Sequence, residues 1–156
     1  MRRPELKTHG GKVSPGKKYI VLEEYPHDQE AFTQGLSFHG GYLYESTGLK
    51  GGKSSVRRVE VTSGAVLADA RLENKYFGEG MTILNNEITS LTWREKKGFV
   101  WDLDTLTRKG EFSFRTKTGE GWGITTDGNQ LIISDGSSTL FFWDPVTKEE
   151  LRRVDV

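Results

Sequence analysis

One pattern, repeated about every 43 residues, constrains the fold of this chain more than any other feature. A glycine followed by a large apolar residue occurs three times, at intervals of 45 and 43 residues: Gly35-Leu36, Gly80-Met81 and Gly123-Ile124. Each pair opens a short apolar run, a polar turn and a second run. A third run then ends in an acidic residue, at Glu60, Asp102 and Asp144. Four short strands in ~43 residues are typical of one blade of a β-propeller.

The rest of the chain favours the same all-β class. Glycine accounts for 19 of the 156 residues, and Gly, Asn and Asp turns separate short apolar runs with no convincing helical periodicity. We therefore predict a partial β-propeller domain over residues 18–156, built from about three four-stranded blades. Residues 1–17 are predicted to be a disordered basic lead-in. Residues 18–25 are expected to form an additional outer strand.

The number of blades predicts an incomplete ring. Propellers usually close with four to eight blades, and three blades leave open sheet edges that promote association. We therefore expect the chain to be a truncated part of a larger ring. A second chain or self-association is expected to cover the open blade edges.

Composition excludes several functions. Lys+Arg and Asp+Glu both number 22, so the zero net charge gives no reason to expect nucleic acid or an anionic membrane as a partner. The absence of cysteine excludes disulfides and a cysteine nucleophile. The three histidines lack metal-ligand spacing, and no cofactor is predicted. A structural cation at Asp135, Asp144 and Glu149 stays open, although solvated turns are favoured there.

The repeat also predicts which side chains meet at one rim of the ring. The innermost strands line the channel, so the residues before the three glycines lie at one height: Gln34, Glu79 and Trp122. Two positions earlier stand Phe32, Phe77 and Glu120, and the returning second strands bring Gly48, Trp93 and Gly136 to the same rim. A carboxyl and an amide among aromatic rings are typical of a small pocket for one polar group. Desolvation by the rings should raise the pKa of Glu79 into the range of a general acid–base.

A purely structural interpretation remains open beside this one. The repeated glycines would let neighbouring backbones approach closely, and Trp93 and Trp122 could simply fill the space between blades. Gln34 and Glu79 favour the pocket, because polar side chains at a crowded axis need a partner.

Five long stretches of the sequence match the motifs of one known family, in the same order and each without gaps. They are YPHDQEAFTQGL, LYESTGLKGGKSSVRRV, YFGEGMTIL, LTWREKKGFVWDL and EGWGITTDGNQLIISDGSSTLFFWDP. From Tyr19 to Val156 the sequence resembles the plant-type glutaminyl cyclases, which also occur in bacteria. The resemblance implies a five-bladed β-propeller that converts the N-terminal glutamine of a peptide or protein into pyroglutamate and releases ammonia. It also implies that no catalytic metal is needed.

The resemblance assigns roles to single residues. It places Phe32, Gln34, Phe77, Trp93 and Trp122 in the substrate pocket, and it makes Glu79 the acid–base carboxyl. It implies that an Asn, a Trp and a Lys from two further blades complete that pocket. The resemblance also implies a secreted or periplasmic setting, but residues 1–17 show no signal peptide, so the compartment is left open.

A second function stays open from the same repeat. Trp101-Asp102 and Trp143-Asp144 are 42 residues apart, which imitates a WD repeat, although the Gly-His dipeptide of those repeats is absent. A non-catalytic, WD-like interaction propeller is therefore the alternative. Ammonia release from a peptide with an N-terminal glutamine distinguishes the two.

Overall fold

Residues 22–49 and 51–156 are described by the computed structural model of the chain, and they form twelve strands and no helix. The first sheet contains β1 (Thr33–His39), β2 (Tyr42–Thr47), β3 (Ser55–Glu60) and β4 (Val66–Arg71). The second contains β5 (Gly78–Leu84), β6 (Glu87–Thr92), β7 (Lys97–Asp102) and β8 (Arg108–Ser113). The third contains β9 (Ile124–Thr126), β10 (Leu131–Ser134), β11 (Thr139–Trp143) and β12 (Glu150–Asp155). No helix in the described part of the chain could therefore span a membrane.

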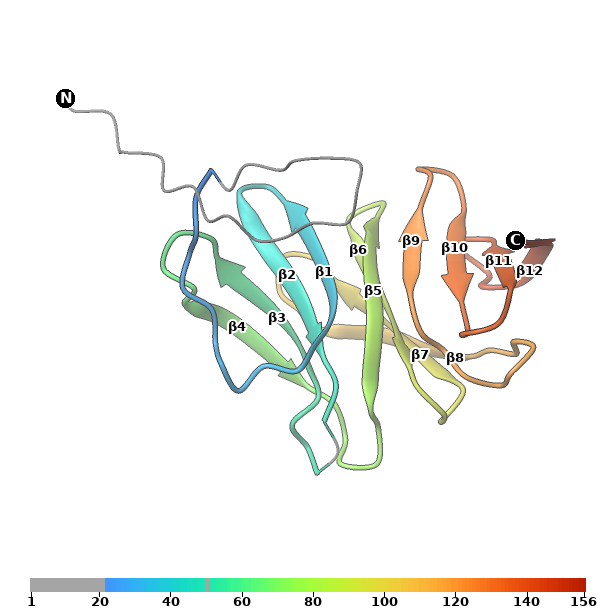
Figure 1. Cartoon of the computed structure of the whole chain (residues 1–156), viewed down its shortest axis with the longest axis horizontal. Coiled ribbons are helices and arrows are strands. Elements are labelled where there is room, and N and C mark those ends of the chain that lie inside the picture. Colours follow the sequence, from blue (N-terminus) through green and yellow to red (C-terminus); the bar gives the residue numbers. More distant parts are fainter. Residues whose placement is uncertain (1–21, 50) are drawn as a thin grey trace, which may run out of the picture.

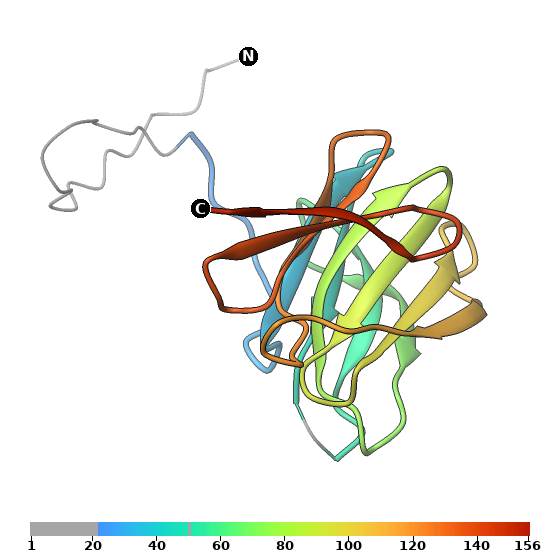
Figure 2. The same ribbon diagram turned by 90° about the vertical axis from the view of Figure 1, so that its right-hand side faces the viewer.

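Each sheet is an antiparallel meander in which the strands follow sequence order. The first strands β1, β5 and β9 lie side by side, with β4 at one end of the molecule and β12 at the other (Figure 1). The third sheet is inclined to the other two, as Figure 2 shows for the orange-to-red strands. These are three adjacent propeller blades, and the predicted fold class is confirmed.

The hairpin turns have the conformation that their residues favour. Asn85 and Asn86 join β5 to β6 with φ angles of 53° and 62°, and Gly40 and Gly41 join β1 to β2 with 57° and 89°. Two successive positive φ values are required by the type I′ turn, which matches the twist of the flanking strands. The Asp102 carboxylate accepts the N–H of Thr105 at 2.9 Å and closes the turn after β7. The repeated acid thus serves a blade turn.

Two apolar cores fill the spaces between the blades. Met81 on β5 packs with the buried cluster that joins blades 1 and 2, and Ile124 on β9 packs with the cluster that joins blades 2 and 3. Trp101 belongs to the first cluster and Trp143 to the second. The second residue of the second and third Gly-apolar pairs therefore faces the preceding blade.

The repeated glycines allow the inner strands to approach closely, as expected. A Cβ atom on Gly35 would lie 2.5 Å from the backbone nitrogen of Met81. A Cβ atom on Gly80 would lie 2.6 Å from the backbone oxygen of Trp122. At this spacing the Gly80 N–H donates to the Trp122 carbonyl at 2.8 Å, which links blade 2 to blade 3.

The predicted outer strand over residues 18–25 is wrong where it can be judged. Residues 22–25 are not in a strand, and residues 1–21, including the predicted lead-in, lie outside the described residues. The segment that follows is held over blade 1 by side chains, because Asp28 pairs with Arg57 at 2.7 Å. The Pro26 carbonyl packs against Gly64. These contacts fix the chain without strand pairing.

Candidate functional site

Two β-bulges place the predicted polar residues at one rim of the blades. The pairing of β1 with β2 shifts register between Thr33 and Gly35, and the pairing of β5 with β6 shifts between Gly78 and Met81. Gln34 and Glu79 are therefore extra residues at the starts of the two inner strands. Bulges re-aim side chains and are frequent beside active sites.

An aromatic wall runs along this rim from blade 1 to blade 2. The Phe32 and Phe77 ring centroids are 6.2 Å apart, and those of Phe77 and Trp93 are 5.6 Å apart, both in edge-to-face geometry. The Phe77 ring lies over Gly48, where a side chain would collide with it. The structure therefore brings Phe32, Phe77 and Trp93 together as the repeat alignment predicted.

A buried ion pair supports the segment that carries Phe32. Glu45 is fully buried on β2, and its carboxylate accepts two guanidinium N–H groups of Arg57, at 3.2 and 2.5 Å. The same carboxylate accepts the Thr33 hydroxyl and contacts Nε2 of His27 at 2.9 Å. A buried charge needs this degree of pairing. The network therefore anchors the start of β1 at the rim.

The four tryptophans divide into two kinds. Trp101 and Trp143 are buried in the cores, whereas Trp93 is partly exposed and Trp122 is 47% exposed at the rim. The indole N–H groups of Trp93 and Trp122 donate to the same Glu120 oxygen, Oε2, each at 2.9 Å. Trp101 and Trp143 therefore fill the space between blades, whereas Trp93 and Trp122 lie at the rim.

The pKa of Glu79 is raised, in the direction that the sequence predicts. Burial, together with the nearby carboxylates of Glu120 and Glu95, raises the pKa of its carboxyl to about 7. The backbone carbonyl of Glu79 accepts the Ser46 hydroxyl of blade 1, which holds the bulge. A carboxyl with a pKa near neutrality can both take and return a proton at physiological pH.

Sequence reasoning assigned no role to three charged residues at this rim. They are Arg94, Glu95 and Glu120, which lie in the loops that follow β6 and β8. Glu120 takes the place that Phe32 and Phe77 occupy in the first two blades. This exchange of a ring for a carboxylate is the one feature of the sequence that could have indicated a role for Glu120. Its meaning depends on contacts between loops, which the repeat does not encode.

A groove of about 550 Å³ lies beside the aromatic wall on blade 2. Its lining residues are Glu95, Lys96, Ser113, Phe114, Arg115, Thr116 and Gly119. Glu95 also reaches the backbone N–H of Phe77 at 3.5 Å, so the groove begins next to the wall. It offers space for a chain that leaves the rim toward β8.

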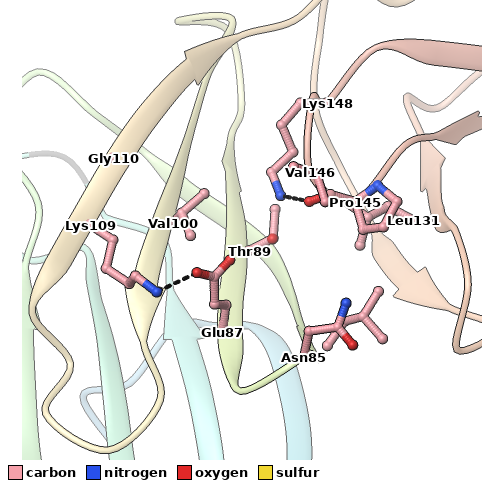
Figure 3. A pocket seen from close by; sticks show the side chains of 11 residues that line it. Asn85, Glu87, Thr89, Val100, Lys109, Gly110, Leu131, Pro145, Val146 and Lys148 are labelled. Atoms are coloured by element: carbon pink, nitrogen blue, oxygen red, sulfur yellow. Dashed lines mark hydrogen bonds and ion pairs between the residues drawn. The ribbon is translucent and has the colours of Figure 1, made fainter.

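A second cavity, of about 490 Å³, opens between blades 2 and 3 at the far ends of the inner strands. The Lys148 side chain points toward the Pro145 carbonyl there, and Lys109 pairs with Glu87 (Figure 3). Burial lowers the pKa of the Lys148 ammonium. Glu79 stands at the opposite end of β5, so this cavity is separate from the candidate site.

The three acids considered for a structural cation do not form a site. Among the described residues, no three potential ligands gather as a metal site would require. Asp135 is buried, contrary to the solvated turn favoured for it, because it accepts the Thr118 N–H at 2.8 Å and the Ser137 hydroxyl at 2.6 Å. The Asp144 carboxylate accepts the N–H groups of Val146 and Thr147, both at 2.8 Å.

Comparisons with known proteins agree on the family and fold. A family model described as glutamine cyclotransferase matches residues 3–156. A curated glutaminyl-peptide cyclotransferase from Arabidopsis thaliana is 46% identical over 128 residues, which cover 81% of this chain and 39% of that protein. The crystal structure of Myxococcus xanthus glutaminyl cyclase matches with a TM-score of 0.77 and 33% identity, over 87% of this chain and 56% of that chain.

More distant solved structures show the fold alone. The WD40 domain of Pan2 from Neurospora crassa matches with a TM-score of 0.65 at 14% identity, over 79% of this chain and 36% of that one. The described blades therefore have propeller geometry, and the sequence similarity points to one family within that fold. The chain spans less than two thirds of each of these proteins.

Proposed function

Since this chain belongs to the glutamine cyclotransferase family, we propose that it acts on the N-terminal glutamine of peptides or proteins, forming pyroglutamate and releasing ammonia. The observation that carries the proposal is the partly buried Glu79 carboxyl, which lies at the same rim as the aromatic wall and has a pKa raised to about 7. The chain spans 39% of the curated relative and 56% of the solved one. The activity of those longer proteins is therefore assigned to this chain only as a proposal.

The wall suits the substrate that we propose. The rings of Phe32, Phe77, Trp93 and Trp122 would enclose the apolar stem of a glutamine side chain. The side-chain amide of Gln34, at the adjacent bulge, would bond the substrate's amide or amine. Holding the side chain folded back toward its own amine supplies most of the gain in an intramolecular reaction.

Glu79 would move the proton that this reaction transfers. The α-amine attacks the γ-carboxamide carbon, and the carboxylate of Glu79 takes a proton from the attacking nitrogen. The same proton goes to the departing amide nitrogen as its bond to carbon breaks, so ammonia leaves and the five-membered ring remains. One carboxyl serves both steps because its pKa lies near neutrality.

We propose that the reaction needs no metal, since Glu79 supplies the proton transfer. We also propose that turnover needs a closed ring, because the resemblance to the family assigns further pocket residues to additional blades. Among those residues, the implied Lys would stabilise the oxyanion that forms at the carboxamide oxygen when the amine attacks.

The test compares this chain with a ring-complete chimaera, in which its matching segment replaces the 128 aligned residues of the Arabidopsis relative. We expect the chimaera to release ammonia from a peptide with an N-terminal glutamine. Glu79→Gln should lower kcat by about 10²–10⁴-fold while changing substrate affinity little.

Glu149→Gln, on an exposed turn of blade 3, is the matched control and should keep the parent rate. Near-parent turnover in the Glu79→Gln chimaera would show that Glu79 is structural. Binding of the peptide without any ammonia release in the parent chimaera would favour the interaction module.

A further inference from the structure

The Glu120 carboxylate joins three side chains from two blades. Its Oε2 atom accepts the indole N–H groups of Trp93 and Trp122, each at 2.9 Å. Its Oε1 atom accepts Nε–H of Arg94, also at 2.9 Å. Arg94 in turn stacks over the Trp93 ring at 3.8 Å, so ring, cation and carboxylate form one unit.

The backbone around Glu120 is itself fixed to blade 2. The Gly121 N–H donates to the Trp93 carbonyl at 2.8 Å, and the Thr116 hydroxyl donates to the Glu120 carbonyl at 2.7 Å. A Cβ atom on Gly121 would lie 2.7 Å from the Thr92 carbonyl oxygen, so the loop lies against β6 without a gap. The carboxylate is therefore held in place before it receives the indoles.

The environments of Glu120 and Glu79 favour opposite protonation states. Hydrogen bonds from Trp122, Trp93 and Arg94 lower the pKa of Glu120, which keeps it ionised and fully engaged. Glu79 has a raised pKa, to which the charge of Glu120 contributes. Two carboxyls whose environments separate their pKa values usually have different roles, and the engaged one is poorly placed to carry protons.

We propose that Glu120 is a positioning residue, whose carboxylate holds the indoles of Trp93 and Trp122 as a single wall across the junction of blades 2 and 3. This inference rests on the proposed function, in which that wall receives the glutamine side chain. Without the carboxylate, the two indole N–H groups lose their shared acceptor, and the exposed Trp122 ring loses its link to blade 2.

The first test uses the full chain labelled with ¹⁵N and follows its four indole N–H signals by NMR. Glu120→Ala should shift the signals of Trp93 and Trp122 and speed their exchange with water. The Trp101 indole donates to the Ser90 hydroxyl at 2.9 Å and should not move, which reports that the variant is folded. Glu95→Gln removes another charge near Glu79 and should leave both rim indoles bonded.

The second test separates positioning from simple packing in the ring-complete chimaera. Glu120→Gln keeps the size of the side chain, and misplacement of the wall should lower kcat/KM by about 10- to 100-fold. The acidic limb of the pH profile should also move to lower pH, because Glu79 loses one of two neighbouring carboxylate charges, Glu95 being the other. Glu120→Asp, which restores the charge, should move that limb back toward the parent.

Unchanged Trp93 and Trp122 signals in Glu120→Ala overturn the proposal. Altered signals with an unchanged kcat/KM also overturn it, because the bonds are then only structural. If the parent chimaera releases no ammonia, the proposed function fails separately, and a glutamine-peptide titration decides the matter. In that titration, the glutamine peptide should shift the indole N–H signals of both Trp93 and Trp122 in the parent, and these shifts should disappear in Glu120→Ala. Any other pattern contradicts the positioning role.

Discussion

At the residue scale, the rim separates two carboxyls by environment alone. Glu79 is partly buried and lies near the carboxylates of Glu120 and Glu95, so the charged form is disfavoured and its pKa rises to about 7. Glu120 receives three N–H groups, so the charged form is favoured and its pKa falls. The sequence predicts the first effect, because the repeat places aromatic residues near Glu79. It could not predict the second, because Glu120 and its partner Trp93 are 27 residues apart in different loops.

A stability measurement tests the environment of Glu79 without any substrate. Its folded-state pKa of about 7 exceeds the ordinary value of 4.5, so its contribution to stability is fully present below about pH 4.5 and is lost as pH rises through 7. Glu79→Gln removes this titration. We therefore expect the variant to gain melting temperature relative to the parent between pH 5 and pH 8.

The comparison needs a control at an exposed carboxyl. Glu149→Gln, in the exposed segment between β11 and β12, should not reproduce the gain in melting temperature expected of Glu79→Gln. A constant difference for Glu79→Gln would mean that the Glu79 carboxyl is not desolvated. In that case the acid–base role would lose its physical basis.

At the scale of elements, β5 and β9 can lie close together because residue 80 is a glycine. A Cβ atom at residue 80 would lie 2.6 Å from the Trp122 oxygen and 2.8 Å from the Ile124 nitrogen, both backbone atoms that cannot move alone. We expect Gly80→Ala to reduce the free energy of unfolding by about 1–3 kcal/mol. Gly110→Ala on β8 meets nothing within 4 Å and should change it by less than about 0.5 kcal/mol. Urea unfolding measures both, and equal values would show that the strands can separate freely.

How far the sequence predicts the elements is clear from particular residues. The 45- and 43-residue intervals place all three inner strands, because each blade is built from local hairpins with recognisable turns. The sequence does not predict the bulges at Gln34 and Glu79, since both blades carry one at the same place and the interval between their glycines does not reveal it. Residues 22–25 look like a strand in composition, yet no neighbouring strand pairs with them among the described residues.

At the scale of the whole molecule, equivalent residues show what a neighbouring blade contributes. Met81 and Ile124 each face the preceding blade and are 3% and 9% exposed. Leu36 holds the same repeat position in blade 1, has no preceding blade among the described residues, and is 55% exposed. Phe38 on the same strand is exposed as well. This outer face of β1 is therefore an apolar surface of the kind that blade contacts normally bury.

The exposed face of β1 predicts the solution behaviour of this chain. Burying a large apolar side chain contributes about 1.5–3 kcal/mol, so contacts through Leu36 and Phe38 favour association over an isolated monomer. We expect sedimentation to show concentration-dependent self-association, which the double substitution Leu36→Lys and Phe38→Lys should reduce. Val146→Lys changes an even more exposed apolar residue on a turn of blade 3 and should leave association unchanged. A monomer at all concentrations, or equal effects of both variants, would show that this face does not drive association.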